Sequence, residues 1–403
     1  MKFSNVSQLA LVSILGLLLA TLLSGCLIVT VDYVYVTTSS GTTAGSPGEI
    51  QIYAADAESG ALRPVDKAVP SGGANPVALA TTSDYANLYV ANQSNDSVVH
   101  FTIAYDGSLT QKETVTLPFA PASLAVNLAN TYLYVAGGTN PAEVAVYPLS
   151  SGTMGTMASS TILTVPNYAT DIMVATGVTV LNNGAAVYVT AYDQSAYNPL
   201  GTVTSSANPG WLFGFTVGSN GTLNPTQYSP YLAGIKPTSL ITDQTNRFLY
   251  ATDFASNELI GYNIESGEVP TFMAAGPFKT GSEPTSVVID PRALYIYVAD
   301  ALSSNVSAYS ITLSTGVPTA VVNVTGSAST TTDTEPVSII VEPALGRYVY
   351  TANALGNDIS GFDLNINSGA LKYDQATPYP TGSNPTALIA VPHGNHAVES
   401  VAE

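Results

Sequence analysis

A phrase of fourteen residues occurs four times along this chain, and it constrains the fold more than any other feature. Copies lie at 88–101 (LYVANQSNDSVVHF), 249–262 (LYATDFASNELIGY), 296–309 (IYVADALSSNVSAY) and 349–362 (VYTANALGNDISGF). Each copy has Tyr at its second place, Asn or Asp at its fifth and an aromatic residue at its end. Repeats with a period of about 20 to 50 residues indicate solenoids, propellers or arrays.

The first copy belongs to a longer unit that reads as four short strands. These are VALAT (77–81), LYVAN (88–92), SVVHFTI (97–103) and KETVTL (112–117), which are rich in β-branched, aromatic or alternating residues. Ser, Asn, Asp and Gly, which form turns readily, stand between them. The unit therefore predicts one four-stranded antiparallel sheet.

Two series of residues extend the repeat to seven units. A Tyr of the second strand recurs at intervals of 45 to 62 residues, and the first strand opens with Pro in six of the seven units. Pro is tolerated at the first residue of a strand because no ladder donor is needed there. The Tyr series is Tyr35, Tyr89, Tyr134, Tyr188, Tyr250, Tyr297 and Tyr350, and the strand openings are Pro76, Pro121, Ala169, Pro237, Pro284, Pro336 and Pro385.

These two series are offset by one unit. The chain starts with a Tyr-bearing strand (32–37, DYVYVT) and ends with a Pro-opened one (384–391, NPTALIAV). If the last strand completes the first sheet, the repeat closes into a circle. The sequence therefore predicts an all-β fold, a seven-bladed β-propeller of four-stranded blades that forms one domain over residues 31–391, followed by a tail at 392–403. An open all-β array or two sandwiches is the alternative, but neither explains why the first sheet lacks a strand that the end of the chain supplies.

The N-terminus has the pattern of an export signal. Lys2 precedes an apolar run from Leu9 to Leu23, and the next residues are Ser24-Gly25-Cys26. This pattern resembles the lipobox of bacterial lipoproteins and implies a signal peptide over 1–25, a lipid on Cys26 that inserts into a membrane, and a tether over 26–30. An ordinary signal peptide or a short anchor helix is the alternative. We expect an exported, lipid-anchored protein of the cell envelope, at the outer membrane or cell surface because Leu27 follows the Cys.

Charge excludes one class of partner. The chain has 28 acidic and 10 basic residues, a net charge of −18, and no Lys/Arg cluster. Phosphate backbones are repelled by such a surface, so we expect no nucleic-acid binding. Cys26 is the only cysteine, so an internal disulfide is impossible. A single closed domain of this kind is expected to be a monomer.

The strand openings and Tyr phrases carry a family resemblance. The NP and EP openings, the YVAN and YTAN phrases and the SNDSV and GNDIS continuations make residues 31–391 similar to the lactonase-type seven-bladed propellers, in particular their YVTN-repeat branch and 6-phosphogluconolactonase-like members. The resemblance implies a propeller and lactone hydrolysis, with His- and Arg-bearing openings that face the channel. Here the seven openings contain neither His nor Arg, and Lys236 is their one basic residue.

Carboxylates are therefore the candidates for chemistry. Asp171, Glu283 and Glu335 precede or open first strands, near the predicted axis, and Asp300 holds a fifth place of the repeated phrase. We take these four as candidate catalytic residues, and Asp171, Glu283 and Glu335 as weaker candidates to hold a central divalent cation such as calcium, since Ca²⁺ prefers oxygen ligands. No other cofactor is predicted. At the fifth place, Asn and Asp are equally expected as ordinary turn residues.

The long loops between strands indicate a binding function instead. Three of them (39–49, 191–211 and 325–335) are expected on one face of the propeller, and long loops on a compact scaffold are often functional. The middle one carries Tyr192, Tyr197 and Trp211, which are candidates to stack on a sugar or grip a peptide. The alternative for Trp211 is a packed position at the start of a strand.

Two functions follow from these features. The first is a binding or scaffolding module that presents its loop-rich face to an envelope glycan, peptide or protein. The second is a lactone hydrolase that acts on a non-phosphorylated, extracytoplasmic lactone. The sequence favours the first, because the openings lack the expected His and Arg residues.

Overall fold

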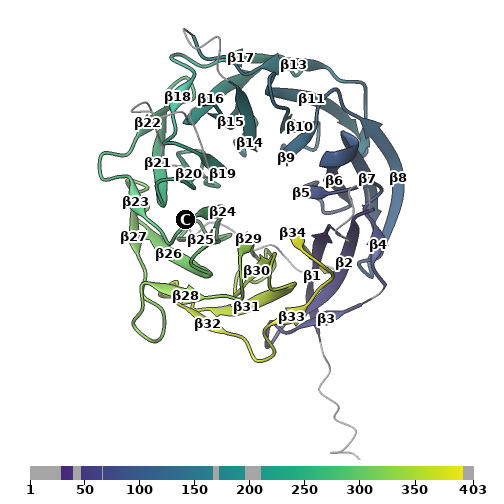
Figure 1. Ribbon diagram of the computed structural model, residues 1–403, viewed down its shortest axis with the longest axis vertical. Helices are drawn as coiled ribbons and strands as arrows, with labels where there is room; N and C mark the ends of the chain where they lie inside the picture. The colour runs from purple at the N-terminus through teal and green to yellow at the C-terminus, as the bar shows by residue number, and fades with distance from the viewer. Residues whose placement is uncertain (1–28, 40–46, 66, 167–171, 196–209, 394–403) are drawn as a thin grey trace, which may run out of the picture.

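The computed structural model describes residues 29–39, 47–65, 67–166, 172–195 and 210–393. In this part of the chain seven antiparallel sheets stand around a central axis like the blades of a propeller (Figure 1). The single helical element among them is one 3₁₀ turn, η1 (Gln93–Asn95). The predicted all-β, seven-bladed propeller is confirmed. The leader at 1–25 and Cys26 lie outside the described residues.

Each blade runs outward from an inner strand through a second and a third strand. The inner strands are β5 (Pro76–Thr81), β9 (Pro121–Val126), β14 (Met173–Val180), β19 (Pro237–Thr242), β24 (Pro284–Ile289), β29 (Pro336–Val341) and β34 (Pro385–Pro392). The second strands are β1 (Thr30–Thr38), β6 (Asn87–Asn92), β10 (Tyr132–Gly137), β15 (Ala186–Asp193), β20 (Phe248–Asp253), β25 (Tyr295–Asp300) and β30 (Tyr348–Asn353). The third strands are β2 (Glu49–Asp56), β7 (Ser97–Ile103), β11 (Glu143–Ser150), β16 (Gly210–Val217), β21 (Glu258–Glu265), β26 (Asn305–Ile311) and β31 (Asp358–Leu364).

The outer edge is one strand, β8 (Leu109–Thr116), in a single blade and two short pieces in the other six. These pieces are β3 (Leu62–Pro64), β4 (Val69–Pro70), β12 (Thr153–Met154), β13 (Ser159–Ile162), β17 (Leu223–Pro225), β18 (Tyr231–Leu232), β22 (Val269–Phe272), β23 (Phe278–Lys279), β27 (Pro318–Ala320), β28 (Ser329–Thr331), β32 (Leu371–Tyr373) and β33 (Tyr379–Pro380). We number the blades in chain order: blade 1 contains β34 and β1–β4, blade 2 β5–β8, blade 3 β9–β13, blade 4 β14–β18, blade 5 β19–β23, blade 6 β24–β28 and blade 7 β29–β33.

Blade 1 closes the ring, as the offset of the repeat predicts. The C-terminal strand β34 pairs antiparallel with β1, with Leu388 opposite Val36 and Ile389 opposite Tyr35. It also lies beside the inner strands β29 and β5, so the seven inner strands form an unbroken circle (Figure 1). Closure of this kind leaves only short, protected sheet edges.

The hydrophobic core is divided among the spaces between neighbouring blades. Between blades 2 and 3, for example, Tyr89 and Val98 pack against Leu133 and Tyr147. The described residues contain one such buried cluster between each pair of adjacent blades. Second strands are therefore buried on both faces, which explains why so few of their residues are charged.

The repeated Tyr of the second strand fastens each blade to the next. All seven rings are fully buried, and six of their hydroxyls donate to a backbone carbonyl in the third-to-fourth-strand turn of the following blade. Among the described residues the hydroxyl of Tyr134 has no hydrogen-bond partner. The six bonds are Tyr35 to Gly107 (2.8 Å), Tyr89 to Gly152 (2.6 Å), Tyr188 to Glu268 (2.9 Å), Tyr250 to Gly316 (2.5 Å), Tyr297 to Gly369 (2.9 Å) and Tyr350 to Gly60 (2.6 Å).

Hydroxyl side chains of the inner strands connect the blades around the channel. The Oγ1 atom of Thr285 donates to the carbonyl of Pro336 in the next blade at 2.9 Å, and Thr386 donates to that of Pro76 at 2.6 Å. Ser338 Oγ accepts the amide of Leu388 at 3.1 Å. The Ser and Thr residues of the Pro-opened phrases therefore hold the inner ring together.

The fifth place of the repeated phrase anchors the loop that enters the same blade. Asp253 is fully buried, and its carboxylate accepts the amides of Ile235 (2.8 Å) and Lys236 (2.9 Å). In blade 2, Asn92 exchanges hydrogen bonds with Ser71 in the same way. Buried Asn and Asp are favoured here because they satisfy backbone groups of a tight loop.

Candidate functional site

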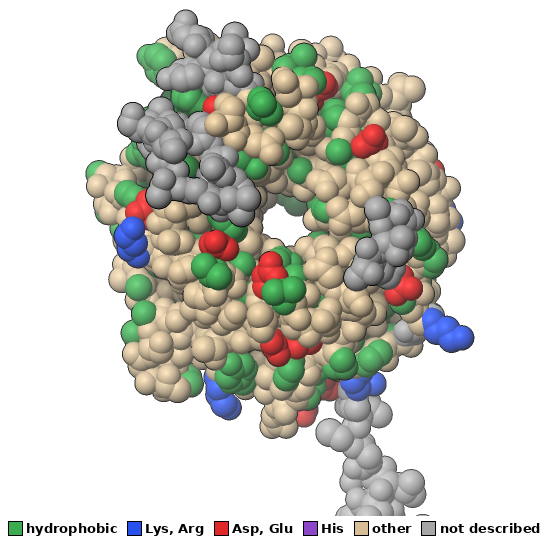
Figure 2. Space-filling model, in the orientation of Figure 1, with side chains coloured by type: hydrophobic (Ala, Val, Ile, Leu, Met, Phe, Trp, Pro, Cys, Tyr) green, Lys and Arg blue, Asp and Glu red, His purple; other side chains and the backbone are tan. Residues whose placement is uncertain are grey.

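One residue of each blade stands at the mouth of the central channel, directly before the inner strand. Its carbonyl accepts the amide of the residue that follows the second strand, as in Lys236 with Phe254 (3.0 Å), Glu283 with Ala301 (2.9 Å) and Glu335 with Ala354 (2.8 Å). The same bond places Asn75, Ala120, Ile172 and Asn384 in the other four blades. Blades 5, 6 and 7 thus carry three charged residues side by side, and the remaining described positions are neutral. Figure 2 shows acidic side chains beside the central opening, over the β24 and β29 blades.

Two of these residues have an unusual backbone. Glu283 and Glu335 are in the left-handed region, with φ of 58° and 62°. Asn75 and Asn384 share this conformation, which Asn tolerates well. For Glu, which lacks that preference, the left-handed region costs about 1–2 kcal/mol. Residues held in such conformations cluster at ligand sites, where the surrounding structure fixes a side chain.

Lys236 lies between two aromatic rings. Its Nζ is 4.0 Å from the centroid of Phe254 and 5.7 Å from that of Tyr192, which comes from β15 of blade 4. Burial lowers the pKa of Lys236, and the negative charge of Glu283 partly opposes this effect. Burial also raises the pKa of the Tyr192 hydroxyl. An ammonium group over an aromatic face is stabilised by the ring quadrupole, which holds the charge at the mouth.

The structure brings together only some of the predicted site residues. Glu283, Glu335 and Tyr192 lie at or beside the mouth, whereas Asp171 and Tyr197 lie outside the described residues. Trp211 is the second residue of β16, opposite Ala191, and packs against the core between blades 3 and 4. This is the packed position that the sequence offered as the alternative.

Asp300 directly precedes Ala301, whose amide bonds to the Glu283 carbonyl, but its side chain is not open to the channel. It is fully buried in blade 6, and its Oδ2 accepts a hydrogen bond from Ser307 at 2.7 Å. Burial raises its pKa to about 7. It occupies the place at which Asp253 anchors a loop, so it cannot touch a ligand in the channel without a rearrangement.

The described residues contain no group of three or more His, Cys, Asp or Glu side chains placed to hold a metal ion. Asp171, one of the three candidates for a calcium site, is not among them. A central cation therefore stays a prediction.

His100, which is buried, serves packing. Its ring stacks on Tyr89 with centroids 5.1 Å apart, and Nε2 lies 2.8 Å from Asn87 Oδ1. Burial lowers the pKa of this imidazole. The side chain lies in the third strand of its blade, away from the channel mouth.

Sequence reasoning missed Phe254. It follows the fifth-place residue of its phrase, where the other copies have Gln93, Ala301 and Ala354. An aromatic residue at this place, in the one blade whose opening carries Lys236, is the signal that would have found it.

The described residues contain no helix that is long and apolar enough to cross a membrane.

Comparisons with known proteins agree with this architecture. The family model described as "Lactonase, 7-bladed beta-propeller" matches residues 34–169 and 232–398, and its interruption falls on blade 4. No curated protein matches the chain.

Several solved structures are similar to this one. A periplasmic gluconolactonase of Pseudomonas aeruginosa has a TM-score of 0.72 and 17% identity, and the match covers 90% of this chain and 100% of that one. A putative 6-phosphogluconolactonase of Bacteroides uniformis has a TM-score of 0.71 and 18% identity, with 90% and 99% covered. A protein from Lactobacillus plantarum has a TM-score of 0.71 and 15% identity, with 90% and 100% covered. At these identities the likeness shows the fold.

Proposed function

Because the chain belongs to the lactonase family of seven-bladed β-propellers, we propose that it binds a sugar-derived ligand at the mouth of its central channel, at a site centred on Lys236. The observation that carries this proposal is the position of the Lys236 ammonium between Phe254 and Tyr192, at 4.0 Å and 5.7 Å from their ring centroids. An ammonium donates to carbonyl or hydroxyl oxygens, and the two rings offer apolar faces for the carbon skeleton of a sugar.

Neighbouring carboxylates define the ligand further. Glu283 and Glu335 accept hydrogen bonds from hydroxyl groups and repel phosphate. The net charge of −18 discourages anionic ligands in the same way. The ligand class is therefore neutral and non-phosphorylated.

Export and anchoring are part of the proposal. The pattern Leu23-Ser24-Gly25-Cys26 after an apolar run supports a lipid on Cys26, and a lipid with two or more acyl chains holds a protein stably on a membrane. The similar protein of Pseudomonas aeruginosa is described as periplasmic, which is consistent with an extracytoplasmic ligand. The propeller then presents its channel mouth to small molecules or glycans of the cell envelope.

Hydrolysis of a non-phosphorylated lactone is the second candidate, and the proximity of Lys236 to Glu283 favours it. In such a reaction the carboxylate takes a proton from water as the water oxygen attacks the lactone carbonyl. The ammonium stabilises the negative charge that develops on the carbonyl oxygen. The ring C–O bond then breaks, the leaving ring oxygen takes the proton held by the carboxyl group, and the products are a hydroxy carboxylate and one released proton.

One pair of measurements separates binding from hydrolysis. The probe is D-glucono-1,5-lactone, with turnover followed by pH-stat and binding of the non-hydrolysable polyol D-glucitol followed by saturation-transfer NMR. A binding protein gives a saturable D-glucitol signal and no lactone turnover above the uncatalysed rate. A hydrolase gives saturable turnover that Glu283→Gln reduces at least tenfold. If neither probe gives a saturable response, the proposed ligand class is wrong.

A further inference from the structure

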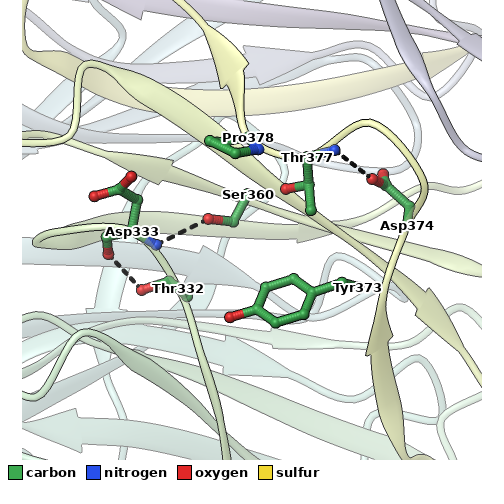
Figure 3. Close-up of a pocket in the computed structure, with 7 residues that line it drawn as sticks. All are labelled: Thr332, Asp333, Ser360, Tyr373, Asp374, Thr377 and Pro378. Carbon is green, nitrogen blue, oxygen red and sulfur yellow. Dashed lines mark hydrogen bonds between the residues drawn. The ribbon is translucent and has the colours of Figure 1, made fainter.

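A pocket lies beside the outer strands of blade 7. Its volume is about 480 Å³. It opens between the third strand β31 and the outer pieces β32 and β33, and its walls include Asp333, Ser360, Tyr373, Asp374 and Thr377 (Figure 3). Neither the channel mouth nor the family resemblance involves these residues.

In blade 5, Met273 occupies the position that Asp374 occupies in blade 7. There the amide of Met273 donates to the carbonyl of Gly261 at 2.9 Å, as the amide of Asp374 donates to that of Gly361 at 3.1 Å. The smaller pocket of blade 5, about 270 Å³, has Phe272, Met273 and Ile260 among its walls. In four other blades the equivalent backbone amide also donates to a carbonyl of the third strand. These residues are Val65, Ala158, Thr226 and Val321. Among these six places, only blade 7 has a carboxylate.

Asp374 is more than nine-tenths buried, with 6% of its surface exposed. Its Oδ1 accepts the amide of Thr377 at 3.0 Å, but its Oδ2 makes no hydrogen bond of ordinary geometry within the described residues. The Tyr379 hydroxyl is close enough to lower the pKa of this carboxyl, although burial raises it by more. A buried acceptor without a full set of donors is costly. Since Met or Val serves the fold at this place in other blades, the carboxylate indicates a ligand.

The carboxylate of Asp333 forms part of the opposite wall, and Asp358 lies behind it. Asp333 and Asp358 share a hydrogen bond. The pKa of Asp333 is lowered, chiefly by the amide of Thr334, whereas burial raises the pKa of Asp358 to about 6. A proton is therefore bound more strongly by Asp358 than by Asp333. The backbone of Asp333 is fixed because its amide donates to Ser360 Oγ at 3.0 Å.

Tyr373 supplies an aromatic platform. One face of its ring stacks on Phe362, with centroids 5.4 Å apart and planes at 26°. Its hydroxyl donates to the carbonyl of Thr331 at 2.9 Å, which fixes the ring in place. The side chain is still 45% exposed, so the face opposite Phe362 is available in the pocket.

We propose that this pocket binds one ring of a neutral, polyhydroxylated ligand, the chemistry of a sugar residue. The ligand's C–H face stacks on Tyr373, and its hydroxyls bond to Asp333, Asp374 and the hydroxyl of Thr377. A divalent cation fits this place poorly, because the described residues here include no metal-ligating group of three. Anions are repelled by Asp333. This site is independent of the one at the channel mouth.

Saturation-transfer NMR on the intact protein with neutral sugars tests the inference. The probes are glucose, galactose, mannose, N-acetylglucosamine, maltose and cellobiose, with CaCl₂ as a separate arm. Tyr373→Ala removes the platform, and Asp374→Met restores the residue that blade 5 has at the same place. Phe272→Ala, the equivalent of the Tyr373 change in blade 5, is the matched control.

We expect at least one sugar to give a saturable signal that Tyr373→Ala and Asp374→Met each weaken at least tenfold and Phe272→Ala leaves unchanged. Tyr373→Phe keeps the ring and should keep the signal, which covers the case in which Tyr373→Ala fails to fold. The inference is overturned if no sugar binds, or if binding is insensitive to both pocket variants. Saturable calcium binding that displaces the sugar would overturn the assigned ligand class.

Discussion

At the scale of single residues, the same Tyr position has different surroundings in different blades. Tyr89 donates to the carbonyl of Gly152 at 2.6 Å, whereas the equally buried hydroxyl of Tyr134 has no partner among the described residues. Burying a hydroxyl without a partner costs free energy, and leaving a carbonyl unpaired costs about 1–3 kcal/mol. The two positions therefore form a natural pair for comparison.

Tyr89→Phe should lower the free energy of unfolding by about 1–3 kcal/mol, because it leaves the Gly152 carbonyl unpaired. Tyr134→Phe, which removes no hydrogen bond of the structure, should be neutral or slightly stabilising. Urea titrations of the three proteins measure both effects. Equal losses in the two variants would show that the interblade bond is not what the Tyr contributes.

Residue roles were harder to predict than residue positions. The Tyr series gave the register of every blade, since an aromatic at a fixed strand position is visible in the sequence. Asp300 looked like a site residue because its type fits chemistry, yet it is buried at a loop anchor. The partnership of Lys236 with Phe254 was missed although the aromatic residue is visible at that place of the repeat, because the contact joins two separate segments of one blade.

At the scale of secondary-structure elements, the shared blade decides whether the ring closes. The inner strand β34 contributes the last sheet partner of β1, and Thr386 on it donates to Pro76 of blade 2. Without β34, the inner edge of β1 and the neighbouring faces of β5 and β29 are exposed. Such edges favour aggregation.

A chain that ends at residue 383 should therefore lose cooperative thermal unfolding and become sensitive to protease. A chain that ends at residue 393, which retains all of β34 (Pro385–Pro392), is the control and should melt like the full protein. Circular dichroism and limited proteolysis compare the two. Cooperative melting of the shorter chain at the same temperature would contradict the role given to the shared blade.

The order of strands was predictable, but the divided outer edge was not. Period-two patterns and turn residues mark the first three strands of each unit, whereas the fourth is short and exposed. In blades 4, 5 and 7, Pro230, Pro277 and Pro378 stand within the outer segment and cannot donate to a ladder. The outer strand of blade 2, β8, contains no Pro and is continuous.

At the scale of the whole molecule, burial of acidic groups links stability to pH. Burial raises the pKa of Asp300 to about 7, and that of Asp358 to about 6. Burial also raises the pKa values of the fully buried Asp32 and Glu342, and the neighbouring Glu342 raises that of Asp32 further. Their contribution is fully present below the unfolded-state pKa and is lost as pH rises through the folded-state pKa, since the native state binds more protons.

The melting temperature should therefore fall as pH rises from about 6.5 to 8, because Asp300, with a pKa of about 7, loses its native-state proton in this window. The window begins at the pKa of an unfolded His, about 6.5. Below this pH window His100, whose pKa is lowered by burial, has the opposite effect, because its contribution to stability increases as pH rises. Thermal melts at several pH values in constant salt measure the slope. Asp300→Asn should flatten it, and a melting temperature that rises over this window would refute the assignment.

Most of the fold follows from the repeat. The proposed function rests on the place where the repeat has a basic opening, Lys236, and an aromatic neighbour, Phe254. Lys236 is half-buried at the channel mouth, whereas Lys279, on β23 at the outer edge of the same blade, pairs with Glu258 at 2.6 Å. These two lysines allow the charge at the mouth to be removed with a control in the same blade. Substitution by Met keeps the length of the side chain and removes only its charge and donors.

The most direct measurement is the dissociation constant of D-glucitol, by saturation-transfer NMR, for the wild type, Lys236→Met and Lys279→Met. The account predicts a loss of at least tenfold in affinity for Lys236→Met, equal to about 1.4 kcal/mol, and no change for Lys279→Met. Equal affinity in all three proteins would place the ligand elsewhere and contradict the assignment of the channel mouth as the binding site.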